Sequence, residues 1–305
     1  MPGPVDGALQ VDGLIRAGLP VANFLIMLGI GMALTVPELA QVARRPKPLL
    51  VGLAGHYLLL PLIGFAFAFA FLFRHSYELA VGFVLIAACP SASSSNALTY
   101  LARGNLALAV TLTASSTLLT LLTIPLLTGA ALQLFAGQSR PIPLPVAQML
   151  GHLVLLVVVP LLAGMAARHL LPRFCRVAES WLNRIGLVLL LGLIAGIVVD
   201  QREVVLPWMG KLALATGGMC LAALCAGHLL GRLCGLERRD AVTIGLEVGV
   251  QNCLLAFLIA FNVLQSVTLG MPAAIYGVVM YVLAFAFVFA SRRSIAARAA
   301  AGAEV

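Results

Sequence analysis

The sequence predicts an all-α membrane protein with nine helical passes. Hydrophobic residues make up 62% of its 305 residues and charged residues only 10%, and the mean hydropathy is +1.07. A soluble domain is about 45–50% apolar and about 25% charged. The apolar stretches reach the roughly 20 residues that a helix needs to cross a bilayer, and the short alternating segments typical of membrane strands are absent.

Polar or charged loops divide the apolar stretches into nine passes. The third and eighth passes are interrupted by polar residues. Pro125 in the fourth pass and Pro160 in the fifth predict kinks, because proline removes a backbone hydrogen bond. The predicted passes are residues 19–37, 48–73, 78–103, 105–136, 147–171, 182–200, 209–233, 240–263 and 270–291.

The basic residues orient these passes. Nine passes place 14 lysines and arginines on one side and 5 on the other, and such residues gather on cytoplasmic loops. We therefore expect an inner-membrane protein with residues 1–18 outside the cytoplasm and a cytoplasmic tail at 292–305. The richer side collects Arg44, Arg45, Lys47, Arg103, Arg168, Arg173, Arg176, Arg184, Arg232, Arg238, Arg239, Arg292, Arg293 and Arg298; the other side holds Arg16, Arg74, Arg140, Arg202 and Lys211.

The same distribution argues against nucleic-acid binding, despite a net charge of +8 and a pI of about 9.6. The positive charges are spread thinly over loops and form no basic helix face. The six cysteines include no CxxC pair and no His/Cys metal spacing, so a zinc site, a redox centre and a disulfide are not expected. No cofactor is predicted.

The order of the passes predicts an inverted repeat. Passes one to four (19–136) and six to nine (182–291) each contain two plain spans, one interrupted span and one plain span, and they run in opposite directions. The fifth pass, 147–171, links them. Inverted repeats with one broken helix each are typical of transporters whose substrate site lies at the repeat interface.

The two interruptions carry the candidate chemistry. They are residues 89–96, CPSASSSN, and residues 247–252, EVGVQN. Pro90 cannot donate a backbone hydrogen bond, and Gly249 permits unusual dihedral angles, so both stretches can expose carbonyl oxygens. Hydroxyl and amide side chains add further oxygen ligands of the kind that hard cations prefer. These ligands suit a hard cation such as sodium, and no other metal is predicted.

Glu247 is the strongest single candidate, because it alone among the acidic residues lies deep in an apolar pass. An isolated carboxylate there costs at least about 2.5–3.5 kcal/mol, and no lysine or arginine lies at mid-membrane to neutralise it. A coupled cation or proton is the favoured interpretation; a protonated glutamate bonded to a neighbouring helix is the structural alternative.

At these segments the chain resembles the bile acid:sodium symporter family, in its nine-pass bacterial form. The resemblance rests on Cys89-Pro90, on residues 94–105, SSNALTYLARGN, and on residues 247–252, in the family's order and spacing. It implies a panel domain and a core domain, with the two broken helices crossing in the core. The panel would contain passes one, five and six, and the core the others.

The resemblance also implies two sodium sites behind the crossing. The first would use Ser95, Asn96, Thr113 and Glu247. The second would use Glu247, Gln251 and the carbonyl groups of Val248 and Val250. Candidates for the substrate cavity are Pro90, Ser91, Ser93, Ser94, Asn252, Met280 and Tyr281.

Two departures from the family pattern affect the ions. Ala109 replaces a serine of the first site, and His56, in the run GHYLLLP, replaces a glutamine of the second. Imidazole is a poor sodium ligand but takes a proton near neutral pH. We hypothesise that His56 replaces the second sodium with a titratable group.

Two further departures affect the substrate. Ser91-Ala92 replaces a glycine pair, and Met280-Tyr281 replaces a His-Asn pair found near the pocket in some bacterial relatives. The predicted function is therefore sodium-coupled symport of an organic anion, bile-acid-like or smaller, by alternating access.

The first alternative is a proton-coupled or uncoupled carrier on the same fold, with His56 and Glu247 titrating. Remote alternatives are an intramembrane enzyme or a channel. The sequence has no HExxH helix and no paired membrane aspartates, and its polarity is concentrated at two points rather than along a pore. An enzyme is not predicted.

Overall fold

The computed structural model describes residues 13–33, 46–72, 76–136, 146–175 and 202–301, with isolated positions between 177 and 192. Within these ranges the regular secondary structure is helical, and one isolated β-bridge lies among the turns and extended segments that connect the helices. Most of the predicted sixth pass, 182–200, lies outside the described residues, as do residues 1–12 of the predicted N-terminal segment and 302–305 of the predicted tail.

The helices of the described ranges overlap the predicted passes other than the sixth, although α1 begins at Gly13 rather than at 19. Five of them are long and apolar enough to cross a membrane, and three shorter apolar helices accompany them in the described part of the chain. In chain order they are α1 (Gly13–Ala33), α3 (Pro46–Ala54), η1 (Gly55–Leu59), α4 (Leu60–Phe67), η2 (Ala68–Leu72), α5 (Tyr77–Ala88), α6 (Ser94–Leu101), α7 (Leu106–Ala136), α8 (Val146–Leu153), η3 (Val154–Val158), α9 (Val159–Leu170), α11 (Arg202–Leu233), α12 (Arg238–Gly249), α13 (Cys253–Leu258), η4 (Ile259–Val263) and α14 (Val267–Ala301), where η marks a π-helical turn.

Both predicted interruptions are confirmed. The third pass is divided into α5 and α6, and the eighth into α12 and α13. Other boundaries differ from the prediction: α11 begins at Arg202 rather than 209, and α14 continues to Ala301, ten residues into the predicted tail. Alanine is the strongest helix former, and residues 296–301 are mostly alanine, so the helix continues.

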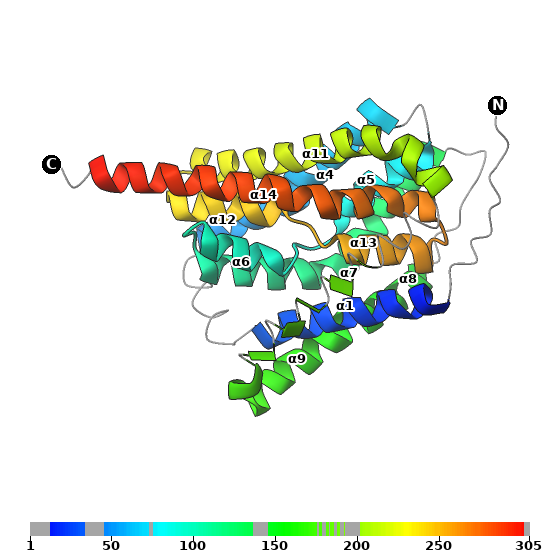
Figure 1. Ribbon diagram of the computed structural model, residues 1–305, viewed down its shortest axis with the longest axis horizontal. Helices are drawn as coiled ribbons and strands as arrows, with labels where there is room; N and C mark the ends of the chain where they lie inside the picture. Colours follow the sequence, from blue (N-terminus) through cyan, green and yellow to red (C-terminus); the bar gives the residue numbers. More distant parts are fainter. Residues whose placement is uncertain are drawn as a thin grey trace.

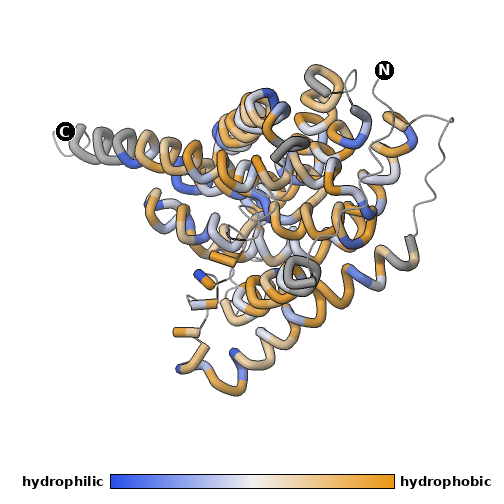
Figure 2. Tube along the Cα trace, turned by 45° about the vertical axis from the view of Figure 1, so that its right-hand side comes forward, coloured by the Kyte–Doolittle hydropathy of each residue, from blue (hydrophilic) through white to orange (hydrophobic). Residues whose placement is uncertain are grey.

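The interrupted helices form the centre of the molecule (Figure 1). Every residue of α5 from Leu79 onward is buried, as is all of α13 and all of α12 from Asp240 onward. The surrounding helices turn leucines outward, and Figure 2 shows hydrophobic residues along most of their length. Leu62, Leu126 and Leu214 are 68–71% exposed, which suits a surface solvated by lipid.

Helices α1 and α9 pack as a pair at one edge of the molecule (Figure 1). A Cβ on Gly31 would lie 2.2 Å from the Leu161 carbonyl oxygen, and one on Gly164 would lie 2.3 Å from that of Leu28. Only glycine permits this approach of two backbones, as is common between membrane helices.

The predicted kink at Pro160 coincides with the π-helical turn η3, which directly precedes the proline's helix. Proline has no backbone N–H, so Pro160 cannot donate the helical hydrogen bond to the carbonyl four residues earlier, that of Leu156. The buried Asn23 side chain on α1 donates to this carbonyl through Nδ2 at 2.7 Å. A second π turn, η1, precedes Pro61 in the same way and carries His56.

Candidate ion-binding site

The two interruptions arise from different local chemistry. Pro90 disfavours helical geometry at the preceding residue, so Cys89 is extended (ψ 159°) and α5 ends at Ala88. In the second interruption, α12 ends at Gly249 and Val250 is extended. Asn252 then starts α13 as its N-cap, because its Oδ1 accepts from the backbone N–H of Leu255 at 3.0 Å.

The interruptions cross and pair through their backbones. Ser91 and Gln251 form an antiparallel bridge. The Ala92 N–H donates to the Val250 carbonyl at 3.0 Å, and the Asn252 N–H donates to the Pro90 carbonyl at 2.9 Å. Each interruption thus satisfies backbone groups of the other, which is the condition for non-helical backbone at membrane depth.

The Glu247 carboxylate lies beside this crossing and is 2% exposed. Ser95 Oγ on α6 donates to Oε1 at 2.5 Å, and Thr113 Oγ1 on α7 donates to Oε2 at 2.9 Å. Its partners in the described part of the chain are hydroxyl groups, with no arginine or lysine among them. The structure therefore brings together three of the four residues predicted for the first sodium site.

Two more residues predicted as sodium ligands have side-chain oxygens that are buried and unpartnered. Asn96 Oδ1, from the fourth predicted residue, is buried without a hydrogen-bond partner. Gln251 donates through Nε2 to the Val248 carbonyl at 2.8 Å and to the Glu247 carbonyl at 3.2 Å, while its Oε1 is also buried and unpartnered. Buried polar atoms are normally paired, so oxygens without a proton donor are natural ligands for a cation.

The carbonyl groups predicted for the second site are engaged within the protein. Besides accepting from Ala92, the Val250 carbonyl accepts from Ser91 Oγ at 3.3 Å, and the Val248 carbonyl accepts from Gln251. Of the second set, Gln251 Oε1 and the Glu247 carboxylate oxygens remain the stronger candidates for ligands.

His56, predicted to stand in place of a second-site glutamine, is buried beside the first interruption. It is 3% exposed, and its Nε2 lies 3.0 Å from the Cys89 carbonyl oxygen. A carbonyl oxygen only accepts, so Nε2 carries the proton. The backbone carbonyl of Glu247 faces the same imidazole. The ring thus presents an N–H donor to backbone carbonyls beside the crossing.

The predicted substrate-cavity residues fall into two groups. Ser91, Asn252 and Met280 are buried in the crossing or in contacts behind it: Ser91 Oγ bonds to Ser95 Oγ, and Met280 Sδ lies 3.9 Å from the Cys253 thiol. Ser93 and Ser94 are half-buried.

The last of these candidates, Tyr281, reaches the crossing from α14. It is half-buried, and its hydroxyl donates to Ser94 Oγ at 3.2 Å. Pro90 contributes its carbonyl to the crossing, as described above.

Sequence reasoning missed two side chains that support the crossing. The fully buried Tyr276 on α14 donates to the Gly249 carbonyl at 2.8 Å. On α7, Ser116 Oγ accepts from the Ser91 N–H at 3.3 Å. The sequence could have indicated both residues, because a hydroxyl group within an apolar pass needs a hydrogen-bond partner inside the protein.

The segment Arg103-Gly104-Asn105, which follows α6 and belongs to the run that resembles the family, also has a physical explanation. Gly104 lies close to α12, where a Cβ would meet Thr243 Oγ1 at 2.7 Å. Asn105 donates through its backbone N–H to Thr243 Oγ1 at 2.8 Å and through Nδ2 to Asp240 at 2.7 Å. These bonds join the segment after α6 to the first turns of α12. The two interrupted passes therefore contact each other both at the crossing and at this end.

Crossed, interrupted helices with a buried carboxylate at their crossing are typical of polytopic membrane transporters. The family model described as the Sodium Bile acid symporter family matches residues 20–208, which is more than half of the chain. The chain belongs to this family, as its motifs predicted.

Relatives in plants and bacteria carry corresponding names. The chain is 30% identical over 255 residues to the probable sodium/metabolite cotransporter BASS2, chloroplastic, of Oryza sativa subsp. japonica (84% of this chain, 59% of that protein). It is 28% identical over 269 residues to the probable sodium/metabolite cotransporter BASS1, chloroplastic, of Arabidopsis thaliana (88% and 65%). It is 29% identical over 261 residues to the uncharacterized sodium-dependent transporter YocS of Bacillus subtilis (83% and 76%). The chain thus spans less than two thirds of the length of the two chloroplast relatives.

Proposed function

We propose that this protein is a sodium-coupled symporter of a small organic anion. The observation that carries the proposal is the Glu247 carboxylate, buried at the helix crossing between two hydroxyl groups. Its charge needs a counter-charge in a medium where an isolated ion is costly. The buried, unpartnered oxygens of Asn96 and Gln251 are further candidate ligands for sodium.

Bound sodium would stabilise the crossing. Ligands from α6, α7 and α12 converge on Glu247, so one ion holds three elements together. The N-terminus of α6 begins at the crossing, and its dipole favours an anion on the substrate side. Sodium occupancy would in this way prepare the site for a carboxylate or sulfonate.

Transport would proceed by alternating access. Among the described residues, α1 and α9 contact each other more extensively than they contact the other helices, which suits a panel that rocks against a core. In this proposal residues 19–136 and 182–291 form inverted repeats and 147–171 links them, with the N-terminus outside and the C-terminus inside a bacterial inner membrane.

Ion-dependent thermal stability tests the proposal directly. A ligand that binds only the folded state raises its stability in proportion to occupancy. We expect purified protein to unfold at a higher temperature in sodium than in potassium or choline, and Glu247→Gln to abolish the difference. Ser266→Ala, which removes the hydrogen bond to another glutamate, Glu78, is the matched control and should retain the sodium response.

A second candidate function is proton-coupled transport, favoured by the imidazole N–H of His56 at backbone carbonyls that would otherwise attract a cation. The same assay distinguishes the two when run from about pH 5.5 to about pH 8.5, across the range in which histidine titrates. Sodium coupling would be rejected if the unfolding temperature did not depend on sodium but changed with pH, and if this pH response were lost in His56→Gln. A sodium response that persists in His56→Gln would reject the histidine mechanism.

A further inference from the structure

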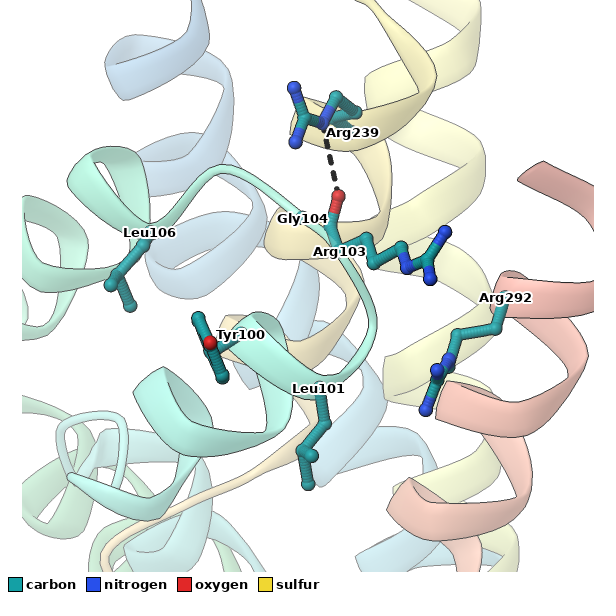
Figure 3. Close-up of a pocket in the computed structure, with 7 residues that line it drawn as sticks. All are labelled: Tyr100, Leu101, Arg103, Gly104, Leu106, Arg239 and Arg292. Atoms are coloured by element: carbon teal, nitrogen blue, oxygen red, sulfur yellow. Dashed lines mark hydrogen bonds between the residues drawn. The ribbon is translucent and has the colours of Figure 1, made fainter. Parts of the chain in front are cut away.

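Three arginines from separate parts of the chain line one pocket at the end of the molecule where α6 and α12 meet. Arg103 follows α6, Arg239 lies in the first turn of α12, and Arg292 lies on α14 (Figure 3). They line a pocket of about 360 Å³ together with Tyr100, Leu101, Gly104 and Leu106. None of these seven lining residues is acidic, so the pocket concentrates positive charge.

The backbone fixes one of the arginines in a conformation that arginine rarely adopts. Arg103 has a φ of 58°, in the left-handed region where glycine is the usual residue. The N–H of Gly104 donates to the Thr99 carbonyl at 2.9 Å and that of Arg103 to the Tyr100 carbonyl at 3.1 Å, which closes α6. A non-glycine residue at such a position is a reason to look for a function of its side chain.

A second arginine supports the first. Arg239 donates through Nε to the Arg103 carbonyl at 3.0 Å, as Figure 3 shows. This bond links α12 to the loop after α6 and holds two guanidinium groups at one pocket. Glu237 and Asp240 line an adjoining pocket that shares Arg239 with this one, and the Asp240 carboxylate accepts from Asn105.

The flank of the pocket is apolar and exposed. Tyr100 is 72% exposed, Leu101 42% and Leu106 43%. Large apolar side chains beside a basic pocket, at the end of membrane-spanning helices, match a lipid molecule: acyl chains against the apolar flank and a charged headgroup against the arginines. A free anion in water would leave the apolar flank without a partner.

We propose that this pocket binds the phosphate group of an anionic phospholipid. Guanidinium groups recognise phosphate oxygens through paired hydrogen bonds, more specifically than a lysine ammonium does. The lipid would bridge α6, α12 and α14, and so stabilise the end of the bundle away from the ion site. The proposal does not depend on which ion or substrate the protein carries.

Lipid titration of the purified full chain tests the proposal. Dioleoyl phosphatidylglycerol, dioleoyl phosphatidylcholine and inorganic phosphate are added separately, and bound lipid is counted by native mass spectrometry alongside thermal stability. We expect phosphatidylglycerol alone to bind and to stabilise the protein, with affinity about fivefold lower in Arg292→Gln and in Arg103→Gln. Arg173→Gln, an exposed arginine beyond the end of α9, is the matched control and should bind as the parent does.

A variant of the strained position separates ligand binding from folding. Arg103→Gly suits the left-handed backbone, so we expect a protein at least as stable as the parent that nonetheless binds phosphatidylglycerol more weakly. Equal binding of both phospholipids, or phosphatidylglycerol affinity unchanged in all three pocket variants, would overturn the proposal. Stabilisation by inorganic phosphate equal to that by phosphatidylglycerol would replace the lipid with a soluble phosphate.

Discussion

The first interruption contains a proline, and the second begins at a glycine. The two also differ in how the surrounding helices hold them. Next to the first, Ser93 and Ser94 are half-buried. The second is buried throughout, and the Gly249 carbonyl at its start accepts from Tyr276 and, at 3.5 Å, from the Cys220 thiol. Helices on two sides therefore hold the second interruption in place.

This difference suggests a division of roles. The second interruption belongs to the helix that carries Glu247, so its rigidity fixes the carboxylate. The first contributes hydroxyl groups to that carboxylate from one face and leaves serines accessible on another. We infer that changes around the second interruption will act mainly on stability, and changes around the first mainly on substrate binding.

The largest effect on stability is expected at Gly249. A Cβ there would lie 2.4 Å from Leu224 Cγ, inside a fully buried contact between α12 and α11. We expect Gly249→Ala to lower the free energy of unfolding by about 1–3 kcal/mol, through overpacking. Thermal unfolding in detergent measures this effect.

Gly210→Ala is the matched control for that substitution. Gly210 also lies within a helix, α11, but a Cβ there would meet nothing within 4 Å. Alanine is the better helix former by about 1 kcal/mol, so the control should be neutral or stabilising. Equal losses in the two variants would show that the close contact at Gly249 is unimportant.

A smaller loss is expected when the second interruption loses its anchor from α14. Tyr276→Phe removes the hydrogen bond to the Gly249 carbonyl and leaves only the weak thiol contact. We expect a destabilisation of about 1 kcal/mol, the typical contribution of one buried hydrogen bond. Tyr100→Phe, at an exposed tyrosine, should leave the unfolding temperature unchanged; a Tyr276 variant as stable as this control would contradict the anchoring role.

The sequence predicted the interruptions well because local chemistry causes them. A proline and a glycine within apolar passes, each beside polar residues, leave few other interpretations. Glu247 was identifiable for a similar reason, since a single carboxylate in an apolar pass needs a partner. The family motif then associated it with Ser95 and Thr113, and the structure shows both hydroxyls donating to it.

The supporting contacts could not be predicted in the same way. Tyr276, Arg239 and Asn23 all donate to backbone carbonyls of distant segments, and a carbonyl has the same chemistry at every residue. Only the packing of the helices decides which carbonyl is freed and which side chain reaches it. The arginine pocket was missed for a related reason: the positive-inside rule already explained each of its charges.

The smallest effect on stability, and the sharpest test of the comparison, is expected at Tyr281. Its hydroxyl donates to Ser94 Oγ beside the first interruption, at a half-buried position. Tyr281→Phe should change the free energy of unfolding by less than about 0.5 kcal/mol. Because Ser94 begins the half-helix that would face the anion, we expect the variant to raise KM for transport while leaving the sodium response intact.

Tyr276→Phe should show the opposite pattern, with a lower unfolding temperature and an unchanged KM. If both tyrosines shift KM, or both shift stability alone, the two interruptions do not differ in role, and the division between a rigid ion-binding half and a substrate-facing half fails.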